Sequence, residues 1–415
     1  MQKLLIFLAL LTSTNLYALS MQEAIDLALI ANHSIKEQEH ILNETKYNYK
    51  SSQGKFYPSL NITYGQTTSN RKNNYNQNTT NSFGANIQYN LFNGFSDFYN
   101  TKSQKYLYEA QKYYLQSTTE DIILLVKSAY INILRQKQSV IVAKQSKDLL
   151  EEQKRESAEF YRVGFIPKND LLAVEVELNK AIQNLLSAQS MLNYYIKTLE
   201  RYTRIKINLD DINELQLHTP TLVEEKLKSI MLEKRAEILY LDNIIQSKDS
   251  NIKSARGEFL PDLNLIGEYT NSDNLKNSKN VNNESTIQLQ VSINIFNGLS
   301  DKYNLESAKT NKMAFTSQRA NLIEELELQL FNAIENYNLA LNAYEVSKVA
   351  LTQAEENYRI SKNRYKARIM STSDFLDAEY LLTEARSNVV LNRYAIIQSL
   401  AEIERITQSK LVSFK

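Results

Sequence analysis

The chain has 415 residues, a formal net charge of +1 and no cysteine. The absence of cysteine excludes disulfides, thiolate metal sites, a cysteine nucleophile and an N-terminal lipoprotein anchor, and the near-neutral charge gives no sign of a nucleic-acid partner. Only 8 Gly and 4 Pro residues are present, so long uninterrupted helices can form and one elongated body is favoured over several compact domains.

The N-terminal residues 1–18 have the layout of a secretory signal peptide. Lys3 precedes the apolar run Leu4–Leu11, and a short polar stretch leads to Ala18. The run is too short to span a bilayer, so we expect cleavage after Ala18 and export of the rest. Leu16, at the −3 position, is larger than usual there, so the cleavage site stays open. No later segment is predicted to be a membrane-spanning helix. If the chain spans a membrane, it must therefore do so with β-strands.

The chain matches itself at an offset of 203 to 204 residues. The block Gly54–Asn61 corresponds to Gly257–Asn264, and Phe92–Asp97 corresponds to Phe296–Asp301. The matching pairs further along are Asp170 with Asp374, Leu172 with Leu376, Glu175 with Glu379, Leu178 with Leu382, Ala181 with Ala385, and Glu200-Arg201 with Glu404-Arg405. One offset kept over four separate blocks indicates a duplicated chain.

We therefore predict two copies of one unit after the signal peptide. The predicted parts are repeat one over 19–205, a linker over 206–222, repeat two over 223–408 and a tail over 409–415. Each repeat is expected to contain a helix, two strands and a long helical hairpin.

In each repeat, a helix of about 35 residues is expected to end near Gly54 or Gly257, and a proline then starts the first strand. The apolar positions of the clearest strand are Ile287, Leu289, Val291, Ile293 and Ile295, which alternate with Gln288, Gln290, Ser292 and Asn294. The first half repeats this pattern at Phe83, Ala85, Ile87, Tyr89 and Leu91, and weaker partner strands contain Leu60, Ile62, Tyr64, Leu263, Leu265 and Tyr269. A period of two predicts strands with one apolar and one polar face.

Two Asn-rich segments of fifteen residues lie between the strands, at Thr67–Asn81 and Asn271–Ser285. We expect both to be loops in water, because they lack the apolar area needed to order themselves. The aromatic residues of the strands have two readings that their pattern does not separate, as interfacial anchors of a membrane sheet or as strand-end core. These residues are Tyr64, Tyr89, Phe92 and Tyr269.

A Ser-Asp pair after each Phe-Asn-Gly offers a helix cap, and a helix of roughly 65 residues, about 100 Å long, is expected to follow. The chain turns at Gly164–Pro167 and at the matching Arg368–Ser371, and a second long helix returns. The seam of the first returning helix is Val174, Leu178, Ala181, Leu185, Ala188, Leu192, Tyr195 and Leu199. On the outgoing helix of repeat two, Leu330, Tyr337, Tyr344, Leu351, Tyr358 and Tyr365 interleave with Ala333, Ala340, Ser347, Ala354 and Ser361. This spacing predicts a packed seam of antiparallel helices and favours it over a substrate-lining track of tyrosines.

Four strands per chain do not close a barrel, and an open four-stranded sheet has two unpaired edges. The strands therefore need partner chains. Two chains would give eight strands, too narrow for a channel, and three would give twelve, but the sequence alone does not decide the number.

The duplicated order of these motifs resembles the TolC-like outer membrane efflux proteins. The blocks G-x-F-x-P-x-L-N and F-N-G-x-S-D and the tip pattern Y-x-x-G/R-x-x-x-x-x-D-x-L carry the likeness over residues 20–408. The resemblance implies a mainly α fold with a small β part. In it, long antiparallel coiled-coil hairpins form an α-barrel joined to a twelve-stranded transmembrane β-barrel shared by a homotrimer. A mixed equatorial girdle is implied around Ile207–Thr221.

The resemblance also implies a function. Such a protein is the outer-membrane exit duct of a tripartite efflux or type I secretion system, with its barrel in outer-membrane lipid and its helical tunnel in the periplasm. Export through it is passive, since the energy comes from an inner-membrane pump and contact is made through a periplasmic adaptor. No enzyme activity and no cofactor are implied.

The resemblance places a periplasmic aperture at the tip of repeat two. Asp374 and Asp377, three apart on one helix face, fall where the family has a carboxylate constriction. In a trimer they would form two negative rings that concentrate cations. Asp374 also fits a capping box that begins at Ser371, so cap and gate both stay open for it, whereas the gate is favoured for Asp377.

Asp170 and Tyr365 match positions that link the hairpins in the closed form of the family. Arg368 replaces the usual tip glycine, and Met370 stands where relatives can carry a basic linking residue, so the link is expected to run through Arg368. The adaptor is expected to contact both tips, at Gly164, Phe165, Ile166, Pro167, Ile369, Met370 and Ser371.

Two other classes of protein compete with this interpretation. An exported structural coiled coil, as a surface or periplasmic scaffold, explains the heptads and the signal peptide but not the two strand pairs. A periplasmic adaptor has one helical hairpin rather than two. An enzyme is disfavoured, because the sequence has no nucleophile triad or phosphate-binding loop and because His33, His40 and His218 are too scattered for a metal site. The cargo (drug, metal or polypeptide), the class of pump and the resting state of the channel stay open.

Overall fold

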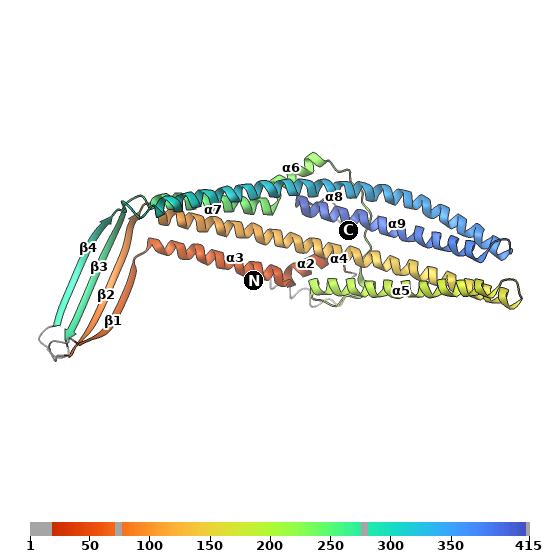
Figure 1. Ribbon diagram of the computed structural model, residues 1–415, viewed down its shortest axis with the longest axis horizontal. Helices are drawn as coiled ribbons and strands as arrows, with labels where there is room; N and C mark the ends of the chain where they lie inside the picture. Colours follow the sequence, from red (N-terminus) through yellow and green to blue (C-terminus); the bar gives the residue numbers. More distant parts are fainter. Residues whose placement is uncertain (1–18, 71–76, 275–280, 412–415) are drawn as a thin grey trace. The chain divides into compact units, whose positions relative to one another are not determined.

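The computed structural model describes residues 19–70, 77–274 and 281–411, so the predicted signal peptide lies outside the described residues (Figure 1). Contacts divide the chain into two units. The hairpin unit consists of residues 1–36, 117–235 and 324–415, and the sheet unit consists of residues 37–116 and 236–323.

The elements follow one another in the same order in both halves of the chain. The first half has α2 (Met21–Ala31), α3 (His33–Gln53), β1 (Ser59–Asn70), β2 (Gln77–Asn93), α4 (Ser96–Arg162) and α5 (Lys168–Thr203). The second half has α6 (Glu224–Lys234), α7 (Ala236–Gly257), β3 (Asp262–Asn274), β4 (Val281–Ser292), α8 (Ser300–Lys366) and α9 (Thr372–Thr407). Short 3-10 turns lie at Gly54–Phe56 and Leu209–Asp211. The predicted mainly helical fold with a small antiparallel sheet is confirmed.

The long helices have the same lengths in both halves: α4 and α8 each contain 67 residues, and α5 and α9 each contain 36. None of the helices in the described ranges has a stretch both apolar and long enough to cross a bilayer.

The single helix predicted before each strand pair is broken once. Asn32 has an extended ψ of 130° between α2 and α3, and its Oδ1 accepts a hydrogen bond from the N–H of Ser34 at 2.8 Å. An Asn side chain that satisfies a nearby N–H competes with a continuing helix. In the second half, Arg235 ends α6, and its guanidinium donates to the carbonyl oxygens of Arg405 and Ile406 at 2.5 and 3.1 Å.

In the sheet unit, the four strands form one antiparallel sheet in the order β1–β2–β3–β4 (Figure 1). The register puts Leu60 opposite Ile87, Ile87 opposite Gly267 and Gly267 opposite Ile287. Because side chains alternate along a strand, apolar residues of all four strands share one face and Asn, Gln and Thr residues share the other. The apolar face is uncovered: Leu60 is 67% exposed and Ile287 is 87% exposed.

The aromatic residues of the strands belong to this exposed face. Tyr64 is 74% exposed and Tyr269 is 39% exposed, so neither is part of a packed core within the chain. Phe83 meets Tyr269 edge to face, with ring centroids 6.5 Å apart.

The strands extend further into the Asn-rich segments than predicted. β1 continues to Asn70 and β2 begins at Gln77, so the expected loop Thr67–Asn81 is paired strand on both sides of residues 71–76. β3 and β4 extend in the same way into Asn271–Ser285. Polar side chains pair across the strands there, as in the Thr68–Thr79 and Asn271–Asn283 hydrogen bonds at 3.3 and 2.5 Å. At the other end, β4 stops at Ser292, so Ile293 and Ile295 lie outside the strand predicted for them.

The hairpin unit is packed along the predicted seam. The buried seam residues are Val174, Leu178, Ala181, Ala188, Leu192 and Leu199 on α5, and Leu330, Ala333, Tyr337, Ala340, Ser347, Ser361 and Tyr365 on α8. Tyr337 and Tyr365 are each only 2% exposed, so these tyrosines fill the core and do not line a track for substrate.

The linker between the two halves packs into the same unit through buried tyrosines. The hydroxyl of Tyr130 lies 2.8 Å from the carbonyl oxygens of both Leu19 and Asn213, and Tyr337 donates to the carbonyl oxygen of Pro220 at 2.9 Å. Leu19 and Ile212 form a parallel β-bridge beside Tyr130. Burial raises the pKa of Tyr130, so its hydroxyl stays protonated and available as a donor.

Candidate functional site

Both hairpins turn through the same backbone motif. In the first tip the Phe165 amide donates to a carbonyl five residues back at 2.8 Å, and in the second the Ile369 amide does the same at 3.0 Å. This bond ends a helix through a residue in the left-handed conformation. That residue is Gly164 with φ 77° in the first tip and Arg368 with φ 66° in the second. A residue other than glycine is strained there by roughly 1 kcal/mol, so Arg368 needs compensating contacts.

Arg368 has such contacts on the other hairpin. The Cζ atom of its guanidinium lies 3.5 Å from the ring centroid of Phe165 and 5.4 Å from that of Phe160. A guanidinium over an aromatic face contributes about 0.5–1 kcal/mol at an exposed site, which is enough to offset most of the backbone strain. The contact joins the two tips within one chain.

Asp170 and Tyr365 also bond from one hairpin to the other. The Oδ2 of Asp170, at the start of α5, accepts a hydrogen bond from the Thr372 hydroxyl at 3.1 Å. The Tyr365 hydroxyl, at the end of α8, shares a hydrogen bond of 3.0 Å with the Ser157 hydroxyl of α4. The Tyr365 ring stacks on Phe375 of α9, with centroids 5.0 Å apart and an interplanar angle of 16°.

Two ion pairs run beside these contacts, from α8 to α4. Lys362 lies 3.1 Å from Glu152 and Lys366 lies 2.8 Å from Glu156. The hydrogen bond from Lys362 holds the pKa of Glu152 below its usual value. All four side chains are partly exposed, so each pair contributes at most about 1 kcal/mol.

Asp374 and Asp377 lie on the exposed side of α9, at its first turns. The Ser371 hydroxyl caps α9 by accepting a hydrogen bond from the Asp374 amide at 3.1 Å. A full capping box would also have a hydrogen bond from the Ser371 amide to the Asp374 carboxylate, and the described residues do not form this bond. Neither carboxylate has a hydrogen-bond or ion-pair partner among the described residues. Both charges therefore face solvent.

A groove of about 1010 Å³ runs between α5 and α9 behind the tips. Its carboxylates are Asp170, Glu177, Asp377, Glu379 and Glu384, and its one cation is Lys180. Lys180 lies 2.6 Å from Glu177 and so neutralises only that carboxylate. The groove is therefore acidic.

Glu379 was not predicted as a site residue, although it is the most unusual group in this groove. Its side chain is 8% exposed, and its Oε1 accepts hydrogen bonds from the hydroxyls of Ser146 at 2.7 Å and Thr383 at 2.9 Å. Burial raises its pKa above the usual value of 4.5, against the lowering effect of these bonds. The sequence does contain a sign of this burial. Glu379 lies four residues after Phe375 and three before Leu382, and this spacing places its carboxylate on the apolar seam of α9.

The outer ends of the tips are apolar and exposed. Phe165 is 53% exposed and Ile369 is 66% exposed. Ile166 and Met370 are half-buried, and Gly164, Pro167 and Ser371 are exposed. In the ranges that the structure describes, no group of His, Cys, Asp or Glu residues has the arrangement of a metal site.

Comparison with known proteins connects this geometry to one family. The model of the outer membrane efflux protein family matches residues 24–202 and 229–407. No curated protein sequence matches the chain significantly.

Several solved structures have a similar fold. The CmeC outer membrane channel of Campylobacter jejuni is 18% identical, with 93% of this chain and 85% of that chain covered and a TM-score of 0.80. The outer membrane protein VceC of Vibrio cholerae is 16% identical, with 93% and 96% covered and a TM-score of 0.80. The open state of the MtrE outer membrane channel of Neisseria gonorrhoeae is 17% identical, with 96% and 93% covered and a TM-score of 0.78. At this identity, the likeness shows a shared fold.

The raised pKa of Glu379 predicts that the stability of the folded chain depends on pH. Because its pKa is raised in the folded chain, the stability contributed by the protonated form is present below about pH 4.5 and is lost as pH rises through the raised pKa. In Glu379→Gln, the amide oxygen still accepts from Ser146 and Thr383, and no charge is buried. The variant should unfold a few degrees higher than the parent at about pH 8 and at the same temperature at about pH 4.

Thermal unfolding followed by circular dichroism at the two pH values measures this difference. Glu384→Gln, which removes an exposed carboxylate of the same groove, is the control and should behave alike at both. A Glu379→Gln effect of equal size at both pH values would contradict the assignment.

Proposed function

Because the chain belongs to the outer membrane efflux protein family, we propose that it is the exit duct of a tripartite efflux or type I secretion system. In this role it lies in the outer membrane, with its helical hairpins in the periplasm. It is a passive conduit: an inner-membrane pump supplies the energy, and a periplasmic adaptor connects the pump to the hairpins.

The observation that carries the proposal is the uncovered apolar face of the four-stranded sheet. Ile287, Leu289 and Val291 are 87%, 62% and 67% exposed on β4 alone. Such a face is stable against lipid, provided that the backbone groups of the sheet edges are paired. Pairing β1 of one chain with β4 of the next satisfies both edges. Three chains then supply twelve strands, with the Asn and Gln face toward an aqueous lumen.

The tip of the second hairpin is the proposed aperture. In a homotrimer, Asp374 and Asp377 would each contribute a ring of three carboxylates, and their lack of partners within the described chain leaves both charges available to a permeating ion. The hydrogen bonds of Asp170 and Tyr365 and the Arg368 contact with Phe165 are proposed to hold the hairpins in the closed position.

The exposed apolar tips are the proposed contact for the adaptor. Phe165 and Ile369 present apolar side chains to solvent at the ends of both hairpins, where they gain from being covered. The neighbouring Gly164, Ile166, Pro167, Met370 and Ser371 belong to the same proposed contact.

The aperture proposal predicts the ion selectivity of the channel. Asp374→Asn combined with Asp377→Asn removes the negative rings and leaves the Ser371 cap in place. In a planar bilayer, the cation preference should fall toward none, and the affinity of a blocking trivalent cation should weaken about tenfold or more.

The matched control is Glu335→Gln combined with Glu355→Gln, which removes two exposed carboxylates of α8 away from the tip. Unchanged selectivity in the aspartate variant would contradict the aperture. The absence of any conducting channel from the parent protein would contradict the proposed function itself.

The proposed closure contacts predict a change in open probability. Tyr365→Phe removes only the hydroxyl bonded to Ser157 and keeps the ring stacked on Phe375. Because a hydrogen bond contributes about 1 kcal/mol net, the open-to-closed ratio should rise about fivefold per bond lost, and Asp170→Ala should act in the same direction. Single-channel recording measures this ratio.

Tyr358→Phe is the control for Tyr365→Phe. Tyr358 also stacks on Phe375, and its hydroxyl has no hydrogen bond among the described residues. If both variants open the channel equally, the Tyr365–Ser157 bond does not hold the hairpins closed.

A further inference from the structure

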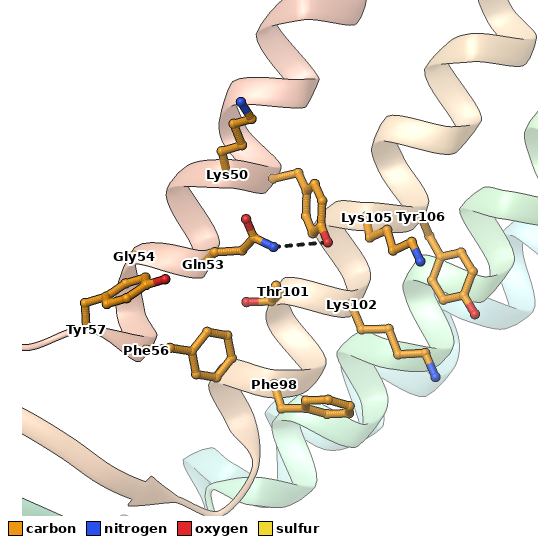
Figure 2. A pocket seen from close by; sticks show the side chains of 11 residues that line it. Lys50, Gln53, Gly54, Phe56, Tyr57, Phe98, Thr101, Lys102, Lys105 and Tyr106 are labelled. Atoms are coloured by element: carbon orange, nitrogen blue, oxygen red, sulfur yellow. Dashed lines mark hydrogen bonds between the residues drawn. The ribbon is translucent and has the colours of Figure 1, made fainter.

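A pocket of about 710 Å³ lies in the sheet unit, between the end of α3 and the start of α4. Phe56, Tyr57 and Phe98 form its aromatic wall, and they are 42%, 72% and 52% exposed. Figure 2 shows Phe56 and Phe98 at the end of the pocket nearer the strands and Lys50 of α3 at the opposite end. β1 begins at Ser59, two residues after Tyr57, so the pocket lies at the junction where the sheet meets the helices.

Three lysines line the pocket: Lys50 on α3, and Lys102 and Lys105 on α4. None of them is paired with a carboxylate within the described ranges, and Lys50 lies only over the Tyr47 ring, 6.0 Å from its centroid. Asp97, a carboxylate in the first turn of α4, is already paired with Lys55 at 3.1 Å. The pocket therefore combines three unneutralised positive charges with an exposed aromatic wall.

The pocket opens on a distinct side of α4. Phe98, Lys102 and Lys105 are spaced four and three residues apart and share one face of the helix. Asn100 lies on the roughly opposite side of the helix, about 140–160° from these three residues by helical geometry. Further along α4, Gln111 faces α3, where its amide donates to the Oε1 of Gln38 at 3.0 Å.

The adjoining sheet is divided in the same way, with apolar residues on one face and Asn and Gln on the other. Phe92, opposite Leu263 on the apolar face of the sheet, packs edge to face against Phe95 with ring centroids 5.1 Å apart, three residues before Phe98. This aromatic contact leads from the apolar face of the sheet to the pocket, which puts the pocket on the proposed lipid-facing side.

We propose that this pocket binds the anionic headgroup of a membrane phospholipid, with Lys102 and Lys105 on the phosphate, Lys50 adding positive charge at the far rim, and the aromatic rings against the glycerol and the upper acyl chains. This inference rests on the proposed function, because it needs the apolar face of the sheet to lie in a bilayer. Lysines beside exposed aromatic rings at the membrane surface are the combination that retains such lipids. The site gives the duct a preference for anionic lipid at the periplasmic surface of its membrane.

The chain contains no tryptophan, so a single introduced one reports on the pocket alone. Phe98→Trp keeps an aromatic residue in the wall. In bilayers of phosphatidylcholine, quenching of its fluorescence by brominated phosphatidylglycerol should indicate a binding preference of about fivefold or more over brominated phosphatidylcholine. Adding Lys50→Gln, Lys102→Gln and Lys105→Gln should reduce this preference toward none.

Two controls are available on the same elements. Lys36→Gln, Lys46→Gln and Lys144→Gln together remove three exposed charges of α3 and α4 outside the pocket and should leave the preference unchanged. Asn100→Trp places the reporter on the side of α4 roughly opposite the pocket and should be quenched by neither lipid.

A third reporter, Ile287→Trp on the apolar face of β4, separates failure of this inference from failure of the proposed function. If it is quenched while Phe98→Trp shows no quenching, or equal quenching by both lipids, the lipid site is wrong and the bilayer position of the sheet stands. If Ile287→Trp is not quenched by any lipid, the sheet does not face a bilayer, and both proposals fall together.

Discussion

A four-stranded sheet with two unpaired edges and one apolar face is unstable alone in water. Each edge strand has a row of N–H and C=O groups without partners in the sheet, and the apolar face exposes side chains of all four strands. Lipid on the apolar face and neighbouring chains at both edges remove these costs together. The proposed membrane location, the proposed oligomer and the proposed aqueous lumen on the amide face would all meet this single requirement.

The helical hairpins differ from the sheet in that their seam is filled within one chain by interleaved large and small residues. Large apolar side chains outside this seam are nevertheless exposed, such as Leu339 and Val346 of α8 at 67% and 69%.

Near the tips Tyr365 and Phe375 continue this packing, and polar contacts join the two hairpins. These contacts are hydrogen bonds such as Asp170–Thr372 and Tyr365–Ser157, two partly exposed ion pairs, and the Arg368 guanidinium over the Phe165 and Phe160 rings. Each contributes about 1 kcal/mol, an amount that binding of an adaptor can offset. Hairpin tips that are joined by weak contacts, at the ends of firmly packed helices, are suited to a gate that opens and closes.

The sequence was most informative where local periodicity decides structure. Alternation over Phe83–Tyr89 and the heptads of α5 and α8 predicted strand faces and buried seams that the structure confirms. The predicted alternation fails at Leu91, where a register shift between Asn90 and Phe92 interrupts the pairing of β2 with β3. The strand ends were less predictable, because Asn-rich composition favours loops whereas cross-strand pairs such as Thr68 with Thr79 depend on register. The break at Asn32 also depends on one side-chain bond, to the Ser34 amide, that periodicity does not reveal.

The candidate site was predictable in position but not in its chemistry. The tip pattern identified Asp170, Tyr365 and Arg368, which the structure brings close to the opposite hairpin. Their partners, Thr372, Ser157 and Phe165, lie 202, 208 and 203 residues away, close to the repeat offset, because matched positions of the two hairpins are neighbours. Which side chains bond there emerges only from packing. Glu379 was missed for the same reason: its burial depends on the neighbouring hairpin, which supplies Ser146.

The trimer that pairs both sheet edges is the central claim, and a disulfide between chains tests it most directly. The chain has no cysteine, and β1 and β4 are opposite edges of its sheet, so cysteines placed one on each cannot meet within a chain. Thr63→Cys would be combined in turn with Thr286→Cys, Gln288→Cys and Gln290→Cys, and the detergent-extracted protein would be oxidised and run on a denaturing gel. The account predicts covalent dimers and trimers, and nothing larger, in at least one combination. Monomers alone in every combination, or a ladder that continues beyond three chains, would contradict it.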